Sequence, residues 1–144
     1  MSREYLHISS QVRYFFSKGH YFWTCCQQEL DDLEADFLSY KKDSVLPDTF
    51  GRDAPYDDDC TYPLVKEEQV AHIHLADADA PFPKFLRQFK RTSDQAHLVY
   101  CQGAMDPNAY LLIIILKPEA HKMARNNNHM HKIGMMAEAF RMKH

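Results

Sequence analysis

Residues 96–116, AHLVYCQGAMDPNAYLLIIIL, decide the fold of this chain. Two stretches rich in β-branched, aromatic and other apolar residues, 96–102 and 109–116, flank a polar segment that contains Asp106 and Pro107. This pattern predicts two antiparallel strands joined by a turn. The second stretch is apolar on both faces, which indicates a strand in the middle of a sheet, covered by helix on at least one side.

The neighbouring segments extend this hairpin to a small α+β domain. FLRQFKR, at 85–91, and the polar residues 92–95 predict a further strand and turn, so that three strands form an antiparallel meander. VRYFF, at 12–16, is compatible with an N-terminal strand. We therefore predict an α+β fold, in which an antiparallel sheet (the three-stranded meander plus the N-terminal strand) packs with an N-terminal helix and a C-terminal helix.

Both helices are predicted from periodicity and caps. QQELDDLEADFLSYKK, at 27–42, repeats apolar residues at helical spacing, which predicts a helix. Thr24 is the expected N-cap of this helix, and Gln27, three residues later, would complete a capping box. The C-terminal helix is expected to begin at about Asn128, with that residue or Asn127 as its cap. Its buried stripe is predicted to consist of Met130, Ile133, Ala137 and Phe140.

The segment between the first helix and the meander offers metal-ligating residue types in two places. Residues 43–69 are punctuated by prolines and include three consecutive acids at 57–59, and we predict a solvated loop here. VAHIHLA follows as a short strand or a turn of helix, and a strand would place His72 and His74 on one face. Because only two aspartates follow nearby as a third ligand, we predict no metal site.

Composition narrows the class of protein. The chain has 144 residues, is 45% hydrophobic and 26% charged, and suits one globular domain. No apolar run approaches the ~20 residues of a membrane helix, and no signal peptide is evident, so we expect a cytoplasmic protein without a membrane partner. The four cysteines match neither a CxxC pattern nor a secreted disulfide framework, which predicts reduced thiols. The four glycines form no nucleotide-binding motif, and we expect no cofactor.

Charge divides the chain into two halves. Residues 1–80 carry 7 basic and 16 acidic side chains, whereas residues 81–144 carry 10 basic and 4 acidic ones together with five of the nine histidines. A basic face could bind phosphates while the whole chain keeps its net charge of −3. The alternative is a bipolar surface without a binding role.

The basic half suits a ribonuclease that needs no metal. In such an enzyme the RNA supplies its own 2′-hydroxyl, while the protein takes one proton, returns another to the departing 5′-oxygen and stabilises the charge on phosphorus. Histidine suits the proton transfers, and lysine and arginine suit the charge. The candidates on or at the ends of strands are Arg87, Arg91, His97 and Lys117. The candidates beyond the last strand are His121, Lys122, Arg125, His129, His131 and Lys132.

The stretch HKMARNNNHMHK, at 121–132, concentrates these groups. Its histidine spacing matches no familiar zinc pattern, and it has no carboxylate or cysteine. We favour a phosphate-facing loop and helix N-terminus, where free backbone N–H groups would add affinity for anions. A structural or partner-facing surface is the alternative.

Several blocks of the sequence resemble one family of bacterial toxins. ADFLSYKKDSVLPDTFGRDAPYDD, VAHIHLAD, FPKFLRQFKRTSDQAHLVYCQG and LLIIILKPEAHKMARNNNHMHKIGMMAEAFRMK closely resemble the YafO family over about residues 30–143. The resemblance implies the toxin of a type II toxin–antitoxin module, an mRNA interferase that associates with the large ribosomal subunit. The expected partners are mRNA, the ribosome and a cognate antitoxin, and a homodimer is an option.

A broader similarity to RelE/YoeB-type toxins implies a RelE-like fold and a set of catalytic residues. In those toxins an arginine precedes the L-V-Y of the second meander strand, and here that position holds His97. Further catalytic side chains follow the last strand, which corresponds to Lys117 and His121. With Arg87, these residues form the expected catalytic set; which one is base and which is acid stays open.

The hypothesis is a toxin endoribonuclease that cleaves mRNA at the translating ribosome by metal-free acid–base catalysis. Residues 24–144 would form one RelE-like toxin domain, and residues 1–23, which depart from the family pattern, would be a divergent segment that contains the N-terminal strand. Two alternatives are a non-catalytic binder of ribosomal RNA that stalls translation and a gyrase-directed poison on the same fold.

Overall fold

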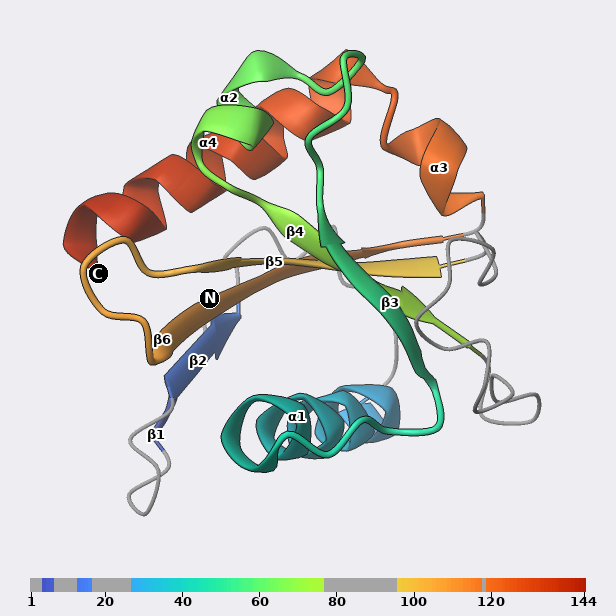
Figure 1. The fold of residues 1–144 in the computed structure, drawn as a ribbon, viewed down its shortest axis with the longest axis vertical. Coiled ribbons are helices and arrows are strands. Elements are labelled where there is room, and N and C mark those ends of the chain that lie inside the picture. The colour runs from blue at the N-terminus through green and yellow to red at the C-terminus, as the bar shows by residue number, and fades with distance from the viewer. Residues whose placement is uncertain (1–3, 7–12, 17–26, 77–95, 118) are drawn as a thin grey trace.

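The structure, a computed structural model, describes residues 4–6, 13–16, 27–76, 96–117 and 119–144. These residues form one six-stranded sheet with helices on both of its faces (Figure 1). The elements are β1 (Glu4–Leu6), β2 (Arg13–Phe16), α1 (Gln27–Asp43), β3 (Phe50–Pro55), α2 (Pro63–Glu67), β4 (Ala71–Leu75), β5 (Ala96–Gln102), β6 (Ala109–Leu116), α3 (Ala120–Met123) and α4 (Asn127–Lys143). No helix among these elements is long and apolar enough to cross a membrane.

The strand order is β1-β2-β6-β5-β4-β3. The four strands from β3 to β6 are antiparallel neighbours, and β6 lies in the middle of the sheet, as its two apolar faces predicted. The α+β fold with an N-terminal and a C-terminal helix is thus confirmed. The N-terminal strand is also present as β2, but it runs parallel to β6, whereas we expected an antiparallel neighbour.

Two expectations about the middle of the chain are corrected. The segment 43–69 is not a plain loop, because it contains β3 and α2. The strand predicted at 85–91 lies outside the described residues. One edge of β5 pairs with β6 and the other pairs with β4, so the meander consists of β4, β5 and β6.

A bulge in β6 shifts the alternation of side chains along this strand by one residue. Val99 pairs with Ile114 and Tyr100 with Leu112, which leaves Ile113 as an extra residue. The bulge reverses the alternation of side chains, so that Ile113 and Ile114 belong to the same core. Both faces of β6 are therefore covered: Leu111, Ile113, Ile114 and Leu116 lie in the core that contains α4, and Leu112 lies in the core that contains α1.

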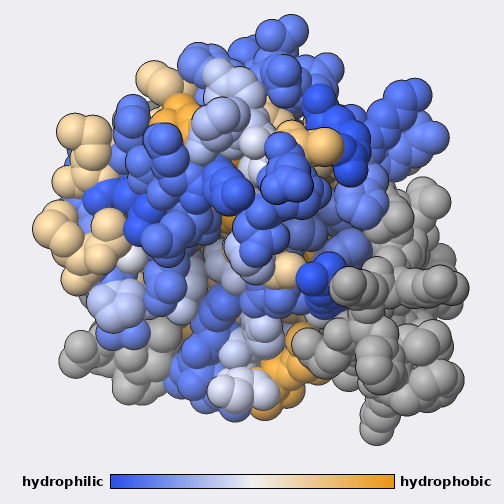
Figure 2. Space-filling view, turned by 45° about the horizontal axis from the view of Figure 1, so that its top comes forward, coloured by the Kyte–Doolittle hydropathy of each residue, from blue (hydrophilic) through white to orange (hydrophobic). Residues whose placement is uncertain are grey.

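The core on one face of the sheet is built with α4. The predicted stripe of Met130, Ile133, Ala137 and Phe140 is buried there, as expected. The helix begins one residue earlier than predicted, because its cap is Asn126, whose side chain accepts hydrogen bonds from the backbone N–H groups of Asn128 and His129. Figure 2 shows that the outer surface around α2 and α4 is largely hydrophilic, with apolar side chains in small groups.

The opposite face packs against α1, which buries Leu33 and Phe37 as its periodicity predicted. Beside this core lies a half-buried polar network around Asp53 of β3. The Asp53 carboxylate accepts hydrogen bonds from the hydroxyls of Tyr40 (2.7 Å) and Tyr100 (2.7 Å). Lys41 lies 3.4 Å from the same carboxylate and over the Tyr100 ring. The network ties α1 to two strands of the sheet.

Candidate functional site

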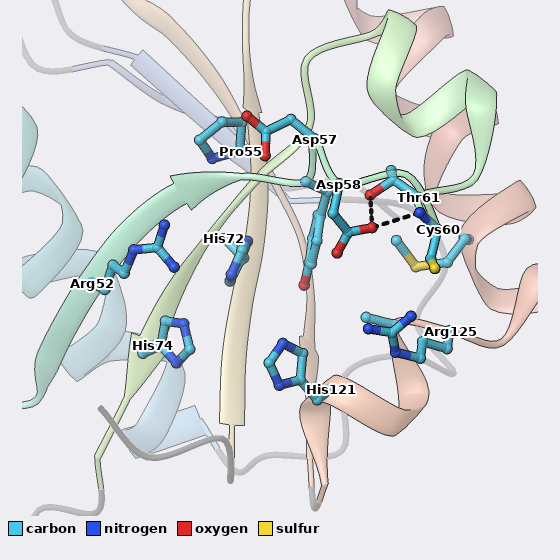
Figure 3. A pocket seen from close by; sticks show the side chains of 13 residues that line it. Arg52, Pro55, Asp57, Asp58, Cys60, Thr61, His72, His74, His121 and Arg125 are labelled. Carbon is cyan, nitrogen blue, oxygen red and sulfur yellow. Dashed lines mark hydrogen bonds between the residues drawn. The ribbon is translucent and has the colours of Figure 1, made fainter. Parts of the chain in front are cut away.

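A pocket of about 270 Å³ opens between the ends of β3 and β4, the loop that follows β3, and α3 (Figure 3). It lies on the face of the sheet that carries α4. Its lining residues are Arg52, Pro55, Tyr56, Asp57, Asp58, Cys60, Thr61, His72, His74, His121, Ala124, Arg125 and Met130.

Cationic and proton-exchanging side chains surround this space. Arg52 reaches it from β3, whereas His121 of α3 and Arg125, just beyond α3, approach it from the other side (Figure 3). His121 and Arg125 are exposed and Arg52 is half-buried, so a ligand in the pocket can reach all three. Two guanidinium groups beside one accessible imidazole suit a phosphodiester.

The floor of the pocket is formed by two buried histidines of β4, His72 and His74, which contact a third buried histidine, His97 of β5. His74 and His97 are direct cross-strand partners, and His72 shares their face because it precedes His74 by two residues. The centroid of the His97 ring lies 4.4 Å from that of His72 and 4.5 Å from that of His74. The three rings therefore contact one another.

Tyr56, the residue directly after β3, fixes two of these rings. Its hydroxyl is hydrogen-bonded to Nδ1 of His97 at 2.9 Å, and its ring stacks on that of His72 with centroids 4.1 Å apart. Burial raises the pKa of Tyr56, so its hydroxyl stays protonated. The interaction holds the His97 ring in one orientation below the pocket.

The environment of His72 keeps its imidazole neutral. Burial is the main cause that lowers its pKa to about 3, and the positive charges of His74, Arg52 and His121 act in the same direction. A neutral imidazole keeps a lone pair available for a hydrogen bond or a metal ion.

The acid run at 57–59 lies at the rim of the same pocket. Asp58 accepts hydrogen bonds from the backbone N–H of Cys60 and the hydroxyl of Thr61, as Figure 3 shows. These bonds are local, so Asp58 shapes the loop. All three acids are exposed, in agreement with the predicted solvated segment.

The structure brings together only part of the predicted site. His121 and Arg125 line the pocket, and His97 lies fully buried beneath it. The candidates that are not among the lining residues are Lys117, Lys122, His129, His131 and Lys132. Arg87 and Arg91 lie outside the described residues.

The first turn of α4 has fewer free N–H groups than the predicted anion site assumed. The Asn126 side chain already binds two of the N–H groups that were expected to attract phosphate. His131 is hydrogen-bonded to the Tyr62 hydroxyl at 3.0 Å, on the surface. The stretch 121–132 therefore divides into two parts. His121 and Arg125 line the pocket, whereas Asn126 caps α4 and His131 lies on its surface.

Sequence reasoning missed Arg52 and Tyr56 and left His72 and His74 out of the site. The His-x-His pattern was a signal, but its third partner, His97, is distant in the sequence and joins it only through strand pairing. Arg52 and Tyr56 lay in a segment that was expected to be loop. Recognition of FGRDAP as a strand would have placed both beside the histidines.

The two described cysteines differ in environment, which predicts different reactivity. Cys60 is exposed, whereas burial raises the pKa of the Cys101 thiol to about 12. Because the thiolate is the reacting form, iodoacetamide should alkylate Cys60 in the native protein and Cys101 only after unfolding in guanidinium. Peptide mass spectrometry measures both sites, and equal modification of the two under native conditions would contradict the buried position of Cys101.

Comparisons with known proteins show the family to which the chain belongs. A family model described as Toxin YafO, type II toxin–antitoxin system, matches residues 38–142. Over 116 residues, the chain is 71% identical to the mRNA interferase toxin YafO of Escherichia coli (strain K12), an alignment that covers 81% of this chain and 88% of the relative. No solved structure was found to match. The chain belongs to the YafO family of toxins from type II toxin–antitoxin systems.

Proposed function

We propose that this toxin is an endoribonuclease that cuts mRNA at the translating ribosome, and that the pocket between β3, β4 and α3 is its active site. The observation that carries the proposal is the meeting of Arg52, His121 and Arg125 in one accessible pocket. The name of the similar toxin, an mRNA interferase, supports the same substrate class.

The two arginines would bind the scissile phosphate. They reach the pocket from different elements, so their guanidinium groups can contact different phosphate oxygens. Such contacts stabilise the additional negative charge that develops on phosphorus as the 2′-oxygen attacks. Phosphate contacts also make RNA affinity fall with rising salt concentration.

His121 would be the residue that exchanges a proton with the substrate. It is the exposed histidine of the pocket, whereas His72, His74 and His97 are buried. Attack by the 2′-oxygen breaks the bond to the 5′-oxygen, so the products are a 2′,3′-cyclic phosphate and a 5′-hydroxyl. The reaction requires one proton to leave the 2′-hydroxyl and one to reach the 5′-oxygen.

His97, expected from the sequence to be catalytic, is better placed as a positioning residue. It is fully buried and touches Tyr56 and His72, both of which line the pocket. Lys117 is exposed and is not among the lining residues, so we do not assign it a role in the reaction.

A cognate antitoxin would silence the enzyme by covering the pocket. Membership of a type II toxin family implies a protein antitoxin as partner. An acidic or amphipathic segment would complement Arg52 and Arg125 and exclude RNA at the same time. The site of action would be the cytoplasm, on the large ribosomal subunit.

The experiment is translation of a defined mRNA with purified protein, followed by primer extension, with and without ribosomes. We expect new 5′ ends that require ribosomes and that are lost or strongly reduced with His121→Ala, because removal of a proton-transfer group costs roughly 10²–10⁴-fold in rate. Lys143→Ala, which removes an exposed cation from the far end of α4, is the matched control and should cleave like the wild type.

Three outcomes would overturn parts of the proposal. Translation that stops while the message stays intact would replace cleavage by ribosome binding. Equal cleavage by His121→Ala and the wild type would remove His121 from the mechanism. If the wild type cleaves naked RNA, a chelator applied to that reaction should leave the rate unchanged; loss of activity in a protein that remains folded would contradict metal-free catalysis.

A further inference from the structure

We propose that His72, His74 and His97 form a binding site for one divalent transition-metal ion, with Zn²⁺ as the chemically matched ion. The inference concerns the floor of the pocket and goes beyond the proposed cleavage reaction. It does not depend on cleavage, because binding is measurable without RNA.

Strand geometry brings the three ligands together. His72 and His74 alternate onto the same face of β4, and His97 is paired with His74 on the neighbouring strand. One ring nitrogen of each residue can be chosen so that all three lie within 4.8 Å of one another. Regular sheet holds each backbone position, which gives the site a rigid base.

The donor set and its spacing suit zinc. Imidazole nitrogens bind Zn²⁺ at about 2.0–2.1 Å, which places neighbouring ligands of a tetrahedral ion about 3.3 Å apart. The observed spacing of up to 4.8 Å is wider than this value, so zinc binding requires the rings to move toward a common centre. Three protein ligands leave a fourth coordination position, which a water molecule can fill.

The surrounding contacts match those of a metal-binding histidine. A metal-bound imidazole commonly uses its second nitrogen in a hydrogen bond that fixes the ring. Tyr56 provides that contact to Nδ1 of His97, which assigns Nε2 to the ion. Nδ1 of His72 is buried and has no hydrogen-bond partner among the described residues. A bound ion would satisfy a nitrogen whose lone pair is otherwise costly to bury.

Charge in the pocket tolerates a dication. Arg52 and Arg125 contribute two positive charges to the lining, but Asp57 and Asp58 contribute two negative ones. The four formal charges cancel, so the lining of the pocket has no net positive charge that would repel the ion. Neutral imidazoles as the ligands leave the ion with its full charge at the floor of the pocket.

The test is titration of the untagged, full-length protein, freed of metal, with Co²⁺ and then with Zn²⁺. We expect one Co²⁺ per chain with the visible absorption of a tetrahedral ion, its displacement by Zn²⁺, and a rise in Tm on zinc binding. His74→Gln and His97→Gln should each weaken zinc affinity by more than 100-fold, since each removes a ligand. Tyr56→Phe keeps all three ligands and should weaken it by about 10–100-fold, as the loss of an orienting contact does.

His131→Ala is the matched control, because it removes an exposed histidine that lies outside the cluster and should bind zinc like the wild type. Circular dichroism of each metal-free variant establishes that it is folded before affinities are compared. The proposal is overturned if wild-type protein binds no Co²⁺ or Zn²⁺ at one ion per chain. It is equally overturned if the folded variants His74→Gln and His97→Gln bind zinc as tightly as the wild type. If those two variants do not fold, unchanged zinc affinity of Tyr56→Phe overturns it.

Discussion

Replacement of Arg52 by alanine is expected to lower the rate of mRNA cleavage by roughly 10²–10³-fold, the usual loss when one group that stabilises transition-state charge is removed. Arg52 lies on β3, a regular strand, and reaches the pocket opposite Arg125. Its guanidinium is half-buried, and its interactions with a phosphate are therefore screened less than those of a fully exposed cation. The measurement is a single-turnover rate on mRNA bound to ribosomes.

Two further variants test whether the loss of activity is specific to the Arg52 guanidinium. Arg52→Lys retains the charge but loses the planar fork, so we expect it to recover only part of the activity. Lys66→Ala removes an exposed cation from α2, outside the pocket, and should leave the rate unchanged. If Arg52→Ala cleaves as fast as the wild type and melts at the same temperature, the pocket is not the active site.

Replacement of Asp53 by alanine is expected to reduce the free energy of unfolding by roughly 2–4 kcal/mol, because it leaves hydroxyl and ammonium donors without their shared acceptor. The Asp53 carboxylate is only 16% exposed and binds the hydroxyls of Tyr40 and Tyr100 at 2.7 Å and the Lys41 ammonium at 3.4 Å. These partners come from α1 and β5, so the variant also loosens the attachment of β3. Urea denaturation followed by circular dichroism measures the change.

Two matched variants distinguish the contribution of the hydrogen-bond network to stability from the effect of removing a negative charge. Asp53→Asn keeps an acceptor for one tyrosine, and we expect it to lose about half as much stability. Asp59→Ala removes an exposed acid of the loop after β3 and should stay within about 0.5 kcal/mol of the wild type. A loss at Asp53→Ala no larger than that at Asp59→Ala would mean that the network contributes little to stability.

Local periodicity was sufficient to locate most of the regular elements. The apolar repeat of 27–42 predicted α1, and Met130, Ile133, Ala137 and Phe140 predicted the buried face of α4. The hairpin 96–116 was also predicted, because alternation and turn residues are properties of neighbouring positions. The fold class followed from these elements together.

The sequence was less informative where an element lacked its usual pattern. FGRDAP contains glycine, aspartate, alanine and proline, which are depleted in strands, yet it forms β3. It is a strand because β4 provides its hydrogen bonds and because Phe50 and Ala54 are buried. Tertiary packing outweighed propensity here, and the error hid Arg52 and Tyr56 from the predicted site.

The sequence by itself determined the composition of the site: a basic, histidine-rich C-terminal half and an isolated His-x-His. Only the tertiary structure decided which of these groups meet. The pairing of β4 with β5 brings His97 against His72 and His74, and α3 brings His121 to the pocket above them. The physical reason is that pairing between strands distant in the chain depends on how the whole core packs, whereas the periodicity of a segment reports only on its own neighbours.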